Sequence, residues 1–121
     1  MAAALAVTVC ACTRDLVKKP EENIYPADYK AQIVAQMRLQ LDDPRDIRDA
    51  YIAEPVLKIS QVTPRYIACV RFNAKDRSGS YKGIKDMAAY FYEGKITQVV
   101  DASLELCGNA AFQPFPELQR P

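Results

Sequence analysis

Residues 65–102 constrain the fold most, because two glycine-containing turns divide them into three segments that alternate between apolar and polar residues. Ser78-Gly79 and Glu93-Gly94 each place a glycine where a tight hairpin requires a positive φ. When both turns are used, one face of the three segments becomes apolar along its length. Its members are Tyr66, Ala68, Val70, Met87, Ala89, Phe91, Ile96 and Val100. Since a slip of one residue in either hairpin would mix the faces, we predict an antiparallel meander of strands 65–74, 81–92 and 95–102.

The other face of this meander carries a cysteine. Beside Cys69 it holds the partly apolar set Ile67, Ala88, Tyr90 and Val99. On the same face Arg71 lies opposite Asp86, which is a favourable cross-strand pair, and Asp101 comes next along. A face that is half apolar requires cover, so another part of the chain is expected to pack there.

The C-terminal segment 103–121 is the available cover for that face. A bond between Cys69 and Cys107 would hold the segment in place and bring its larger apolar side chains close to the sheet. These side chains are Phe112, Phe115 and Leu118. Two prolines, Pro114 and Pro116, favour an extended rather than a helical course for this tail.

A helix is predicted before the meander, opening at Pro26 and ending at Asp43-Pro44. Proline suits the first helical position, and Asp28 suits the first turn because of the helix dipole. Apolar residues recur with a helical period and form one stripe, which comprises Tyr29, Ile33, Val34, Met37 and Leu41. The residue before a proline avoids the α region, so the helix ends there. We expect the stripe to pack on the apolar face of the meander.

The stretch between helix and meander has weaker signals. Asp43 could cap a further short turn with Pro44 at its first position. Residues 47–59 then take on strand character, although Pro55 interrupts them. Since proline has no N–H to donate to a ladder, an edge strand or a bulge is expected here.

The first twelve residues, MAAALAVTVCAC, are uncharged. A helix that spans a bilayer needs about 20 apolar residues, so this segment is too short to cross a membrane. Its length and composition fit the apolar part of a signal peptide, although no basic residue precedes it. Val9-Cys10-Ala11-Cys12 resembles a bacterial lipobox, which implies cleavage before Cys12 and lipidation of its sulfur. Cleavage by an ordinary signal peptidase and a packed N-terminal helix are the alternatives.

The rest of the chain divides into a tether and one domain. Residues 13–25 are polar, contain Pro20 and are predicted to form a poorly ordered tether, and residues 26–121 are predicted to form a single domain. If the chain is exported into an oxidising compartment, Cys69 and Cys107 are expected to form a disulfide. Two reduced, buried cysteines acting as small apolar residues are the alternative.

A motif in the first hairpin resembles one in small exported proteins and lipoproteins of proteobacteria, C-x-x-x-N-A-K-[ND]-x-x-G-x-Y-x-G. The residues that match it are Cys69, Asn73, Ala74, Lys75, Asp76, Gly79, Tyr81 and Gly83. Leu41-Asp42-Asp43-Pro44 matches a Leu-x-Asp-Pro segment that ends the preceding helix in these proteins, and Cys107 matches a later cysteine. Asp76 stands where Asn is frequent, and Ser80 stands where Gly often occurs. The resemblance covers about residues 40–107 and implies export, a disulfide and an envelope location, but no activity.

Composition argues against several classes of function. The chain has 16 Lys and Arg against 15 Asp and Glu, and so lacks the basic excess of a nucleic-acid-binding protein. It contains no histidine, which is the commonest general base and metal ligand. Asp42, Asp43, Asp46 and Asp49 have neither the spacing nor the glycine of a calcium loop, so they are expected to be solvated near the helix end. We predict no cofactor, no metal site and no catalytic residue.

Polar residues gather at the end of the first hairpin and form the candidate interaction tip, which comprises Asn73, Lys75, Asp76 and Tyr81. They could form a recognition surface or a Lys/Asp acid–base pair. In the structural interpretation, Asn and Asp satisfy turn backbone groups while Lys keeps an edge soluble. A Lys–Asp pair without a pocket or a nucleophile is no mechanism, so we favour the structural interpretation.

The sequence therefore predicts an α+β domain with one N-terminal helix on an antiparallel meander of three to four strands and an extended tail pinned by Cys69–Cys107. The predicted function is that of a non-enzymatic binding or scaffolding module in the bacterial cell envelope or periplasm. A membrane anchor through Cys12 and a protein or cell-wall partner are expected, without nucleic acid. The alternative is a secreted inhibitor of a hydrolase such as lysozyme, because a rigid loop with Lys75, Asp76 and Tyr81 could enter an enzyme cleft.

Overall fold

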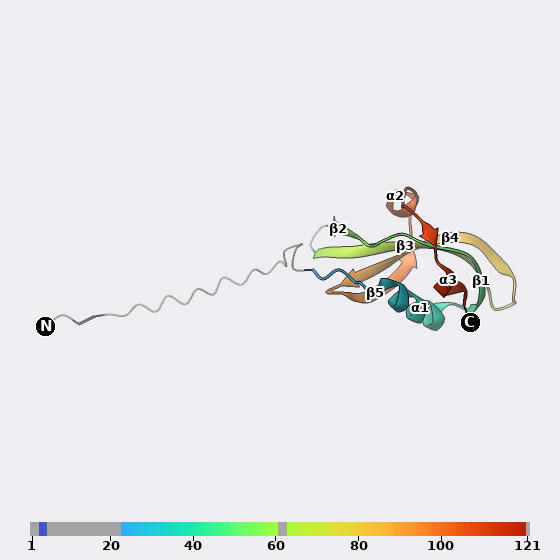
Figure 1. Cartoon of the computed structure of the whole chain (residues 1–121), viewed down its shortest axis with the longest axis horizontal. Coiled ribbons are helices and arrows are strands. Elements are labelled where there is room, and N and C mark those ends of the chain that lie inside the picture. The colour runs from blue at the N-terminus through green and yellow to red at the C-terminus, as the bar shows by residue number, and fades with distance from the viewer. Residues whose placement is uncertain (1–2, 5–22, 61–62, 121) are drawn as a thin grey trace.

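The structure is a computed structural model that describes residues 3–4, 23–60 and 63–120 (Figure 1). The chain is α+β, with a six-stranded antiparallel sheet in the order β5-β4-β3-β1-β6, and β2 pairs with β3 beside β1. The elements are α1 (Tyr29–Gln40), β1 (Asp43–Ile52), β2 (Val56–Ser60), β3 (Thr63–Lys75), β4 (Tyr81–Tyr92), β5 (Lys95–Asp101), α2 (Leu104–Cys107), β6 (Gln113–Pro114) and α3 (Pro116–Gln119). Figure 1 shows α1 and α3 on one side of the sheet and α2 on the other.

The β3–β4 hairpin has the predicted register along most of its length. Ala68 pairs with Ala89 and Val70 with Met87, so the apolar face forms as expected. The predicted two-residue turn at Ser78-Gly79 is wrong, because the N–H of Asp76 donates to the Ser80 carbonyl across a three-residue loop. A register shift between Asn73 and Lys75 compensates for the longer loop, so the pairing closer to the core is unchanged.

The β4–β5 hairpin closes through the predicted Glu93-Gly94 turn, in which both residues have positive φ values of 51° and 80°. A bulge follows, because Phe91 pairs with Ile96 whereas Tyr90 pairs with Gln98. The extra residue reverses the sides of the next two valines. Val99 is buried against the helix and Val100 is 39% exposed on the other face, opposite to the prediction. A bulge is the physical reason, since one extra residue exchanges the faces of a strand.

Helix α1 presents the predicted stripe to the sheet. Ile33 and Met37 are fully buried, and Tyr29, Val34 and Leu41 pack against the same core. The helix begins at Tyr29 rather than at Pro26, because the chain makes a turn in which the Ala27 N–H donates to the Tyr25 carbonyl. Pro26 is buried instead of opening the helix.

The predicted turn at Asp43-Pro44 is wrong, since β1 begins at Asp43 and pairs with β3. The local signal is real, because the Asp43 side chain accepts a hydrogen bond from the Arg45 N–H at 3.0 Å. Pairing with β3 nevertheless extends the chain here, at the cost of two irregularities where Asp46 and Asp49 have positive φ. Pro55 lies between β1 and β2, so it interrupts the strand character that was predicted for residues 47–59.

The C-terminal tail follows a different path from the predicted one. It forms two short helices, α2 and α3, and between them β6 pairs with the outer edge of β1 at Tyr51 and Ile52. This crossing carries Phe115 and Leu118 around the edge into the helix-side core, whereas Phe112 stays on the disulfide side. An unpaired sheet edge is a strong template for backbone pairing, and the sequence pattern does not reveal which edge is open.

Two apolar clusters result, one on each face of the sheet. The helix-side cluster contains the large side chains of α1, α3 and the sheet. The disulfide-side cluster contains Ala53, Ile67, Ala88 and the bonded pair Cys69 and Cys107. The predicted disulfide is therefore present.

The described part of the domain begins at Asn23, inside the stretch predicted as a tether. Asn23 is 6% exposed, and Tyr25 packs edge-on against Tyr66 with ring centroids 5.3 Å apart. The predicted lipidation site Cys12 lies outside the described residues. Within those residues, no helix is both long enough and apolar enough to cross a membrane.

Candidate functional site

The structure brings the four residues of the candidate tip together at the β3–β4 hairpin. Lys75 Nζ lies 3.0 Å from Asp46 Oδ2, and the Tyr81 hydroxyl donates to the Asp46 carbonyl oxygen at 2.8 Å. The guanidinium carbon of Arg48 lies 4.1 Å from the centroid of the Tyr81 ring. Both Lys75 and Tyr81 are thus engaged by the irregular part of β1.

The other two tip residues hold the hairpin backbone. Asp76 Oδ1 accepts hydrogen bonds from the Ser78 N–H at 2.9 Å, the Ser78 hydroxyl at 2.6 Å and the Ser80 N–H at 3.2 Å. Asn73 Oδ1 accepts from the Gly83 N–H at 3.0 Å. Gly83 has a φ of 98°, so this bond fixes a backbone conformation that favours glycine.

The pKa shifts of Lys75 and Asp76 at the tip indicate a structural role. The side-chain hydrogen bond from Ser78 lowers the pKa of Asp76, and the hydrogen bond to Asp46 raises the pKa of Lys75. Both shifts favour the charged form and move the pKa values apart. A general acid or base needs a pKa near the working pH, so this pair is not suited to proton transfer.

The acidic residues after α1 form ion pairs. Asp42 contacts Lys82 at 3.1 Å and Arg77 at 3.6 Å, and the hydrogen bond from Lys82 lowers the pKa of Asp42. Asp43 pairs with Arg45 at 3.2 Å. In the described ranges no three His, Cys, Asp or Glu residues are grouped to hold a metal ion.

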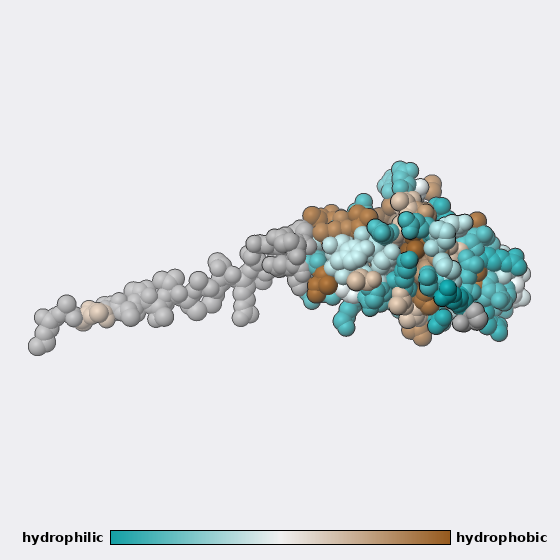
Figure 2. Space-filling model, in the orientation of Figure 1, coloured by the Kyte–Doolittle hydropathy of each residue, from teal (hydrophilic) through white to brown (hydrophobic). Residues whose placement is uncertain are grey.

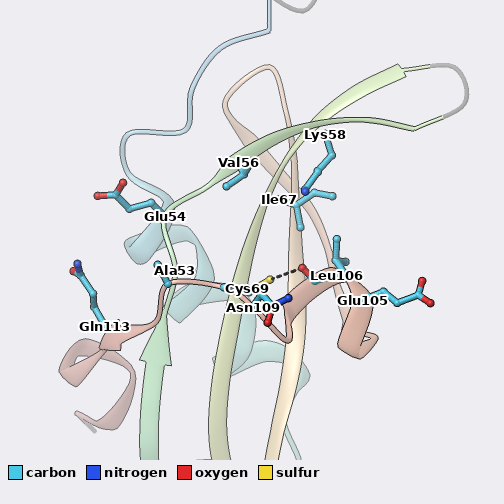
Figure 3. Close-up of a pocket in the computed structure, with 12 residues that line it drawn as sticks. Ala53, Glu54, Val56, Lys58, Ile67, Cys69, Glu105, Leu106, Asn109 and Gln113 are labelled. Carbon is cyan, nitrogen blue, oxygen red and sulfur yellow. Dashed lines mark hydrogen bonds between the residues drawn. The ribbon is translucent and has the colours of Figure 1, made fainter.

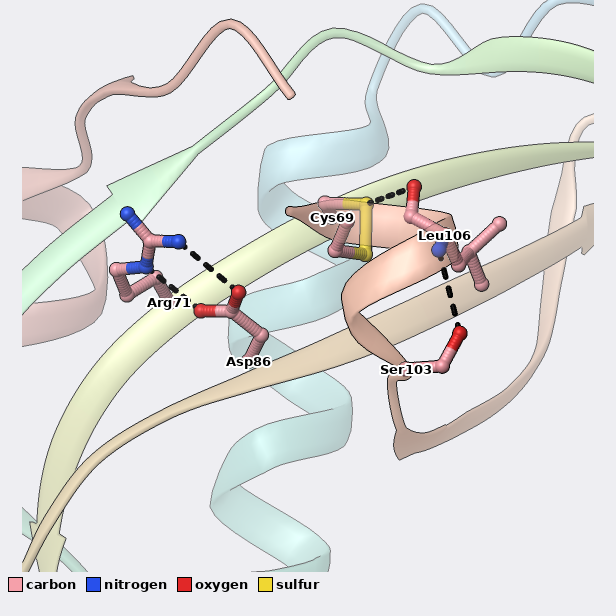
Figure 4. The surroundings of a disulfide bond; sticks show 6 residues. Cys69, Arg71, Asp86, Ser103 and Leu106 are labelled. Atoms are coloured by element: carbon pink, nitrogen blue, oxygen red, sulfur yellow. Dashed lines mark hydrogen bonds and ion pairs between the residues drawn. A yellow bond between two sulfur atoms is a disulfide. The ribbon is translucent and has the colours of Figure 1, made fainter. Parts of the chain in front are cut away.

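A second polar group lies beside the disulfide (Figure 4). Arg71 donates from Nε and Nη2 to the two carboxylate oxygens of Asp86 at 2.7 and 3.0 Å, as the register predicted. This hydrogen bonding raises the pKa of Arg71. Asp101 does not extend the pair, because the β5 bulge turns it to the helix face, where it contacts Lys85 at 3.1 Å. The Arg71 guanidinium carbon lies 4.1 Å from the centroid of the Phe112 ring and fixes the tail there.

Beyond this pair, the disulfide side of the sheet is hollowed into a groove of about 480 Å³ (Figure 3). Its floor is Ile67 and Cys69 of β3, and one wall is Val56 and Lys58 of β2. The opposite wall is α2 and the residues after it, which the disulfide holds against the sheet. The full set of lining residues is Ala53, Glu54, Val56, Lys58, Ile67, Cys69, Glu105, Leu106, Asn109, Ala110, Ala111 and Gln113.

The groove exists because the side chains on this face are small. Ala53, Ala110 and Ala111 leave space that larger residues would fill. Ser103 caps α2 by accepting a hydrogen bond from the Leu106 N–H at 3.2 Å, and Cys69 Sγ lies 3.8 Å from the Leu106 carbonyl oxygen. A short helix would not stay folded alone, so the cap and the disulfide define this wall.

The polar side chains of the groove differ from those of the tip in being unpartnered. Within the described part of the chain, none of them makes a side-chain hydrogen bond or an ion pair. They are Glu54, Lys58, Glu105, Asn109 and Gln113. Figure 3 shows Glu54 and Gln113 pointing outward on one side and Lys58 pointing towards Ile67. These groups are available to an external ligand.

The strand that borders the groove has an open outer edge. Ile59 pairs with Pro64, which has no N–H, and the Pro64 carbonyl is taken by the Asn23 side chain at 2.7 Å. Ile59 and Pro64 therefore form a non-hydrogen-bonded pair, and the alternation of an antiparallel ladder directs the N–H and C=O groups of Leu57 and Ile59 outward. Among the described residues, no strand pairs with this edge of β2.

Other segments cover parts of the β1 and β5 edges. On β1, β6 pairs with Tyr51 and Ile52, and Gln119 Oε1 accepts from the Ala50 N–H at 3.0 Å. On β5, two glutamines of α1 bind the backbone: the Ile96 N–H donates to Gln32 Oε1 at 2.8 Å, and Gln40 Nε2 donates to the Val99 carbonyl at 3.1 Å. Among the described residues, the outer edge of β2 pairs with no strand, and residues 81–85 of β4, which extend beyond β5, also have no partner on their outer side.

Sequence reasoning missed the groove and placed the candidate site at the tip. The walls of the groove come from residues 53–58 and 105–113, which no local pattern links. Pro55 and the two alanines before Phe112 were the available signals, and neither indicates a ligand by itself. Comparisons of this chain with protein-family models, curated proteins and solved structures find no match.

Proposed function

We propose that the protein is a non-enzymatic binding module of the bacterial cell envelope, tethered to a membrane through Cys12, which binds an extended segment of a partner protein. The single observation that carries the binding role is the groove, whose polar groups have no partner among the described residues and which borders an edge of β2 that no described strand pairs with. An extended segment added to β2 would receive backbone hydrogen bonds from Leu57 and Ile59. Its side chains on the disulfide face would reach the groove.

The tip supports this choice, because its charged groups already have partners within the chain. A ligand at the tip would have to break those contacts before it could make its own. A ligand that binds in the groove would not have to break such contacts first. An extended peptide also suits the edge better than a small cell-wall fragment, because strand addition uses the repeating N–H and C=O groups of both chains.

The test of binding is capture of partners from envelope extracts by the full chain carrying Cys12→Ser. Ala111→Arg places a long charged side chain in the groove, and Ala35→Arg makes the same change on the exposed face of α1. We expect partners that the parent chain captures to be lost with Ala111→Arg and kept with Ala35→Arg. Capture that is equal for both variants, or no capture by the parent chain, would contradict the groove assignment.

The test of the anchor is metabolic labelling with palmitate in a bacterial host. Cys12→Ser should lose the label and move to the soluble periplasmic fraction, because the lipidated sulfur is then missing. Cys10→Ser is the matched control, since it removes the neighbouring thiol and leaves the acceptor. Persistent labelling of Cys12→Ser, or a mature chain that still carries residues 1–11, would refute the anchor.

A hydrolase inhibitor is the second candidate, and the hairpin loop favours it. Three hydrogen bonds to Asp76 hold the loop in one conformation, and the Arg77 side chain at its apex is 89% exposed. Such preorganisation reduces the entropy lost when a loop enters a cleft. If this function is correct, Arg77→Ala abolishes inhibition of a cell-wall hydrolase such as lysozyme, whereas Ala111→Arg does not.

A further inference from the structure

The end of the sheet farthest from the tip is organised around a buried asparagine. Asn23 Nδ2 donates to the Pro64 carbonyl at 2.7 Å, and Asn23 Oδ1 accepts from the Glu93 N–H at 3.0 Å. One side chain therefore joins the start of β3 to the β4–β5 turn. The described part of the domain also begins at this end, with Asn23.

The sheet register places three cations in one row at this end. Lys58 pairs with Arg65 across β2 and β3, and Tyr92 pairs with Lys95 across β4 and β5. Arg65 and Tyr92 complete the row, because the Arg65 guanidinium carbon lies 4.3 Å from the centroid of the Tyr92 ring. Directly opposed like charges repel each other, so the Lys58–Arg65 pair is not explained by stability.

Among the described residues, these cations also have no carboxylate partner. In the described ranges no ion pair involves Lys58, Arg65 or Lys95, whereas the lysines of the tip half of the sheet, Lys75, Lys82 and Lys85, are all paired. Arg65 is held by the Tyr92 ring and by its hydrogen bond to the Pro64 carbonyl at 3.2 Å. That leaves part of its guanidinium free to bind an anion.

Exposed aliphatic side chains accompany the cations. Ile59, which pairs with Pro64, is 72% exposed, and Ile24, which lies against Gly94, is 59% exposed. Figure 2 shows hydrophobic surface at this end of the domain, next to the grey trace. Aliphatic residues beside unpaired Lys and Arg are the composition of surfaces that lie at a membrane interface.

We propose that this end of the domain, comprising Ile24, Ile59, Lys58, Arg65 and Lys95, docks on an anionic phospholipid surface. The aliphatic side chains enter the boundary between headgroups and acyl chains, and the cations face lipid phosphates. The inference deepens the proposed function, on which it rests for the presence of a membrane. Ten residues separate Cys12 from Asn23, which is eleven Cα–Cα steps, so a lipid on Cys12 would lie at most roughly 40 Å from this end.

The charge arrangement favours a bilayer over an acidic peptide. The row runs across four strands rather than along one, so a single extended peptide on the β2 edge would reach only Lys58. The three cations share the disulfide face, whereas Ile59 pairs with Pro64 on the helix face, so a planar anionic surface reaches both groups by meeting this end of the domain edge-on. Docking would also leave the tip at the far end of the domain, directed away from the membrane (Figure 1).

The first measurement is co-sedimentation of the full chain carrying Cys12→Ser with vesicles. We expect binding to phosphatidylcholine vesicles that contain about one third phosphatidylglycerol, and none to phosphatidylcholine alone. Lys95→Glu reverses one charge of the row and should weaken binding roughly 25-fold. Arg38→Glu makes an equal charge change on the exposed face of α1 and should have little effect.

The second measurement uses the absence of tryptophan from the chain. Ile59→Trp should show a blue shift of its emission on anionic vesicles, whereas Leu39→Trp, on the exposed side of α1, should not. No binding, equal binding of Lys95→Glu and Arg38→Glu, or an unshifted Ile59→Trp spectrum would overturn the proposal. Equal affinity for soluble polyglutamate would assign the row to an acidic polypeptide instead. Labelling of Cys12 is measured independently, so failure of docking and failure of the anchor remain distinguishable.

Discussion

The two faces of the sheet are stabilised in different ways. The helix side buries large side chains, among them Phe72, Phe91, Phe115, Ile33 and Met37, each with less than 2% of its surface exposed. The disulfide side has mostly small residues around one covalent bond and leaves a groove open. Burial of apolar area stabilises the first face, whereas chain connectivity holds the second together. A surface that does not need to be filled for stability is available for binding.

The largest effect is expected from a comparison of two phenylalanines in the C-terminal tail. Phe115 is fully buried in the helix-side core, and Phe112 is half-buried beneath Arg71 on the other face. Phe115→Ala should reduce the free energy of unfolding by about 3–5 kcal/mol because it leaves a large cavity. Phe112→Ala should cost clearly less in the same urea titration. Equal losses would mean that the two faces do not differ as described.

Removal of the disulfide should have the next largest effect. Cys69 and Cys107 are 38 positions apart, so the chain-entropy estimate for their bond is about 4 kcal/mol as an upper figure. The double variant Cys69→Ala/Cys107→Ala should lose up to this amount, measured by urea unfolding.

Removal of the disulfide should mainly affect the segment that it holds against the sheet. Amide hydrogens of Gly108 and Ala110, which donate to the Leu104 and Cys107 carbonyls, should exchange faster in the double variant. The Leu41 amide, which donates to Met37 in the helix, is the control and should exchange at a similar rate relative to global unfolding. Faster exchange in both places would show that the disulfide supports the whole domain rather than one face.

The smallest effect concerns the tip, which belongs to neither face. The hydrogen bond from Ser78 lowers the pKa of Asp76 below its ordinary value of 3.8, so its ionised form stabilises the loop. This contribution is complete well above pH 3.8 and is lost as the pH falls through the lower folded pKa. Carbon NMR should place the Asp76 titration midpoint below 3.8, with the Ser78 and Ser80 amide signals following it.

The control for this titration is Asp76→Asn, which removes the charge and should abolish the pH dependence of both serine amides. A midpoint of Asp76 at or above its ordinary value would contradict the structural role of the tip. It would also return the tip to consideration as an interaction site.

Local patterns were sufficient for part of the fold. The alternation of residues 65–92 identified the β3–β4 pairing although the turn at Ser78-Gly79 was wrong, because a slip of one residue would expose the apolar face. The helical period of Ile33 and Met37 identified the buried side of α1 for the same reason. The disulfide was predicted from the cysteine count together with the expectation of export, and the residues that surround it were anticipated only in part.

Other features depended on contacts between distant segments. The bulge that exchanges Val99 and Val100 has no marker in the alternation, since both residues are valine. The β1 strand formed against a local turn signal at Asp43 because pairing with β3 contributes more than a short turn. The sequence predicted that Asn23 belongs to a polar tether, yet its side chain joins the start of β3 to the β4–β5 turn.

The sequence by itself determined the α+β class, the central hairpin and the helix-side apolar face, and it favoured the pairing of Cys69 with Cys107. These follow from residue periodicity and from chemistry that a short stretch of chain carries with it. Only the tertiary structure decided that the tail crosses the β1 edge, that the β2 edge stays open and that a groove remains above Cys69. The physical reason is that an open edge and an empty space are properties of what does not pack together, and no local pattern records them.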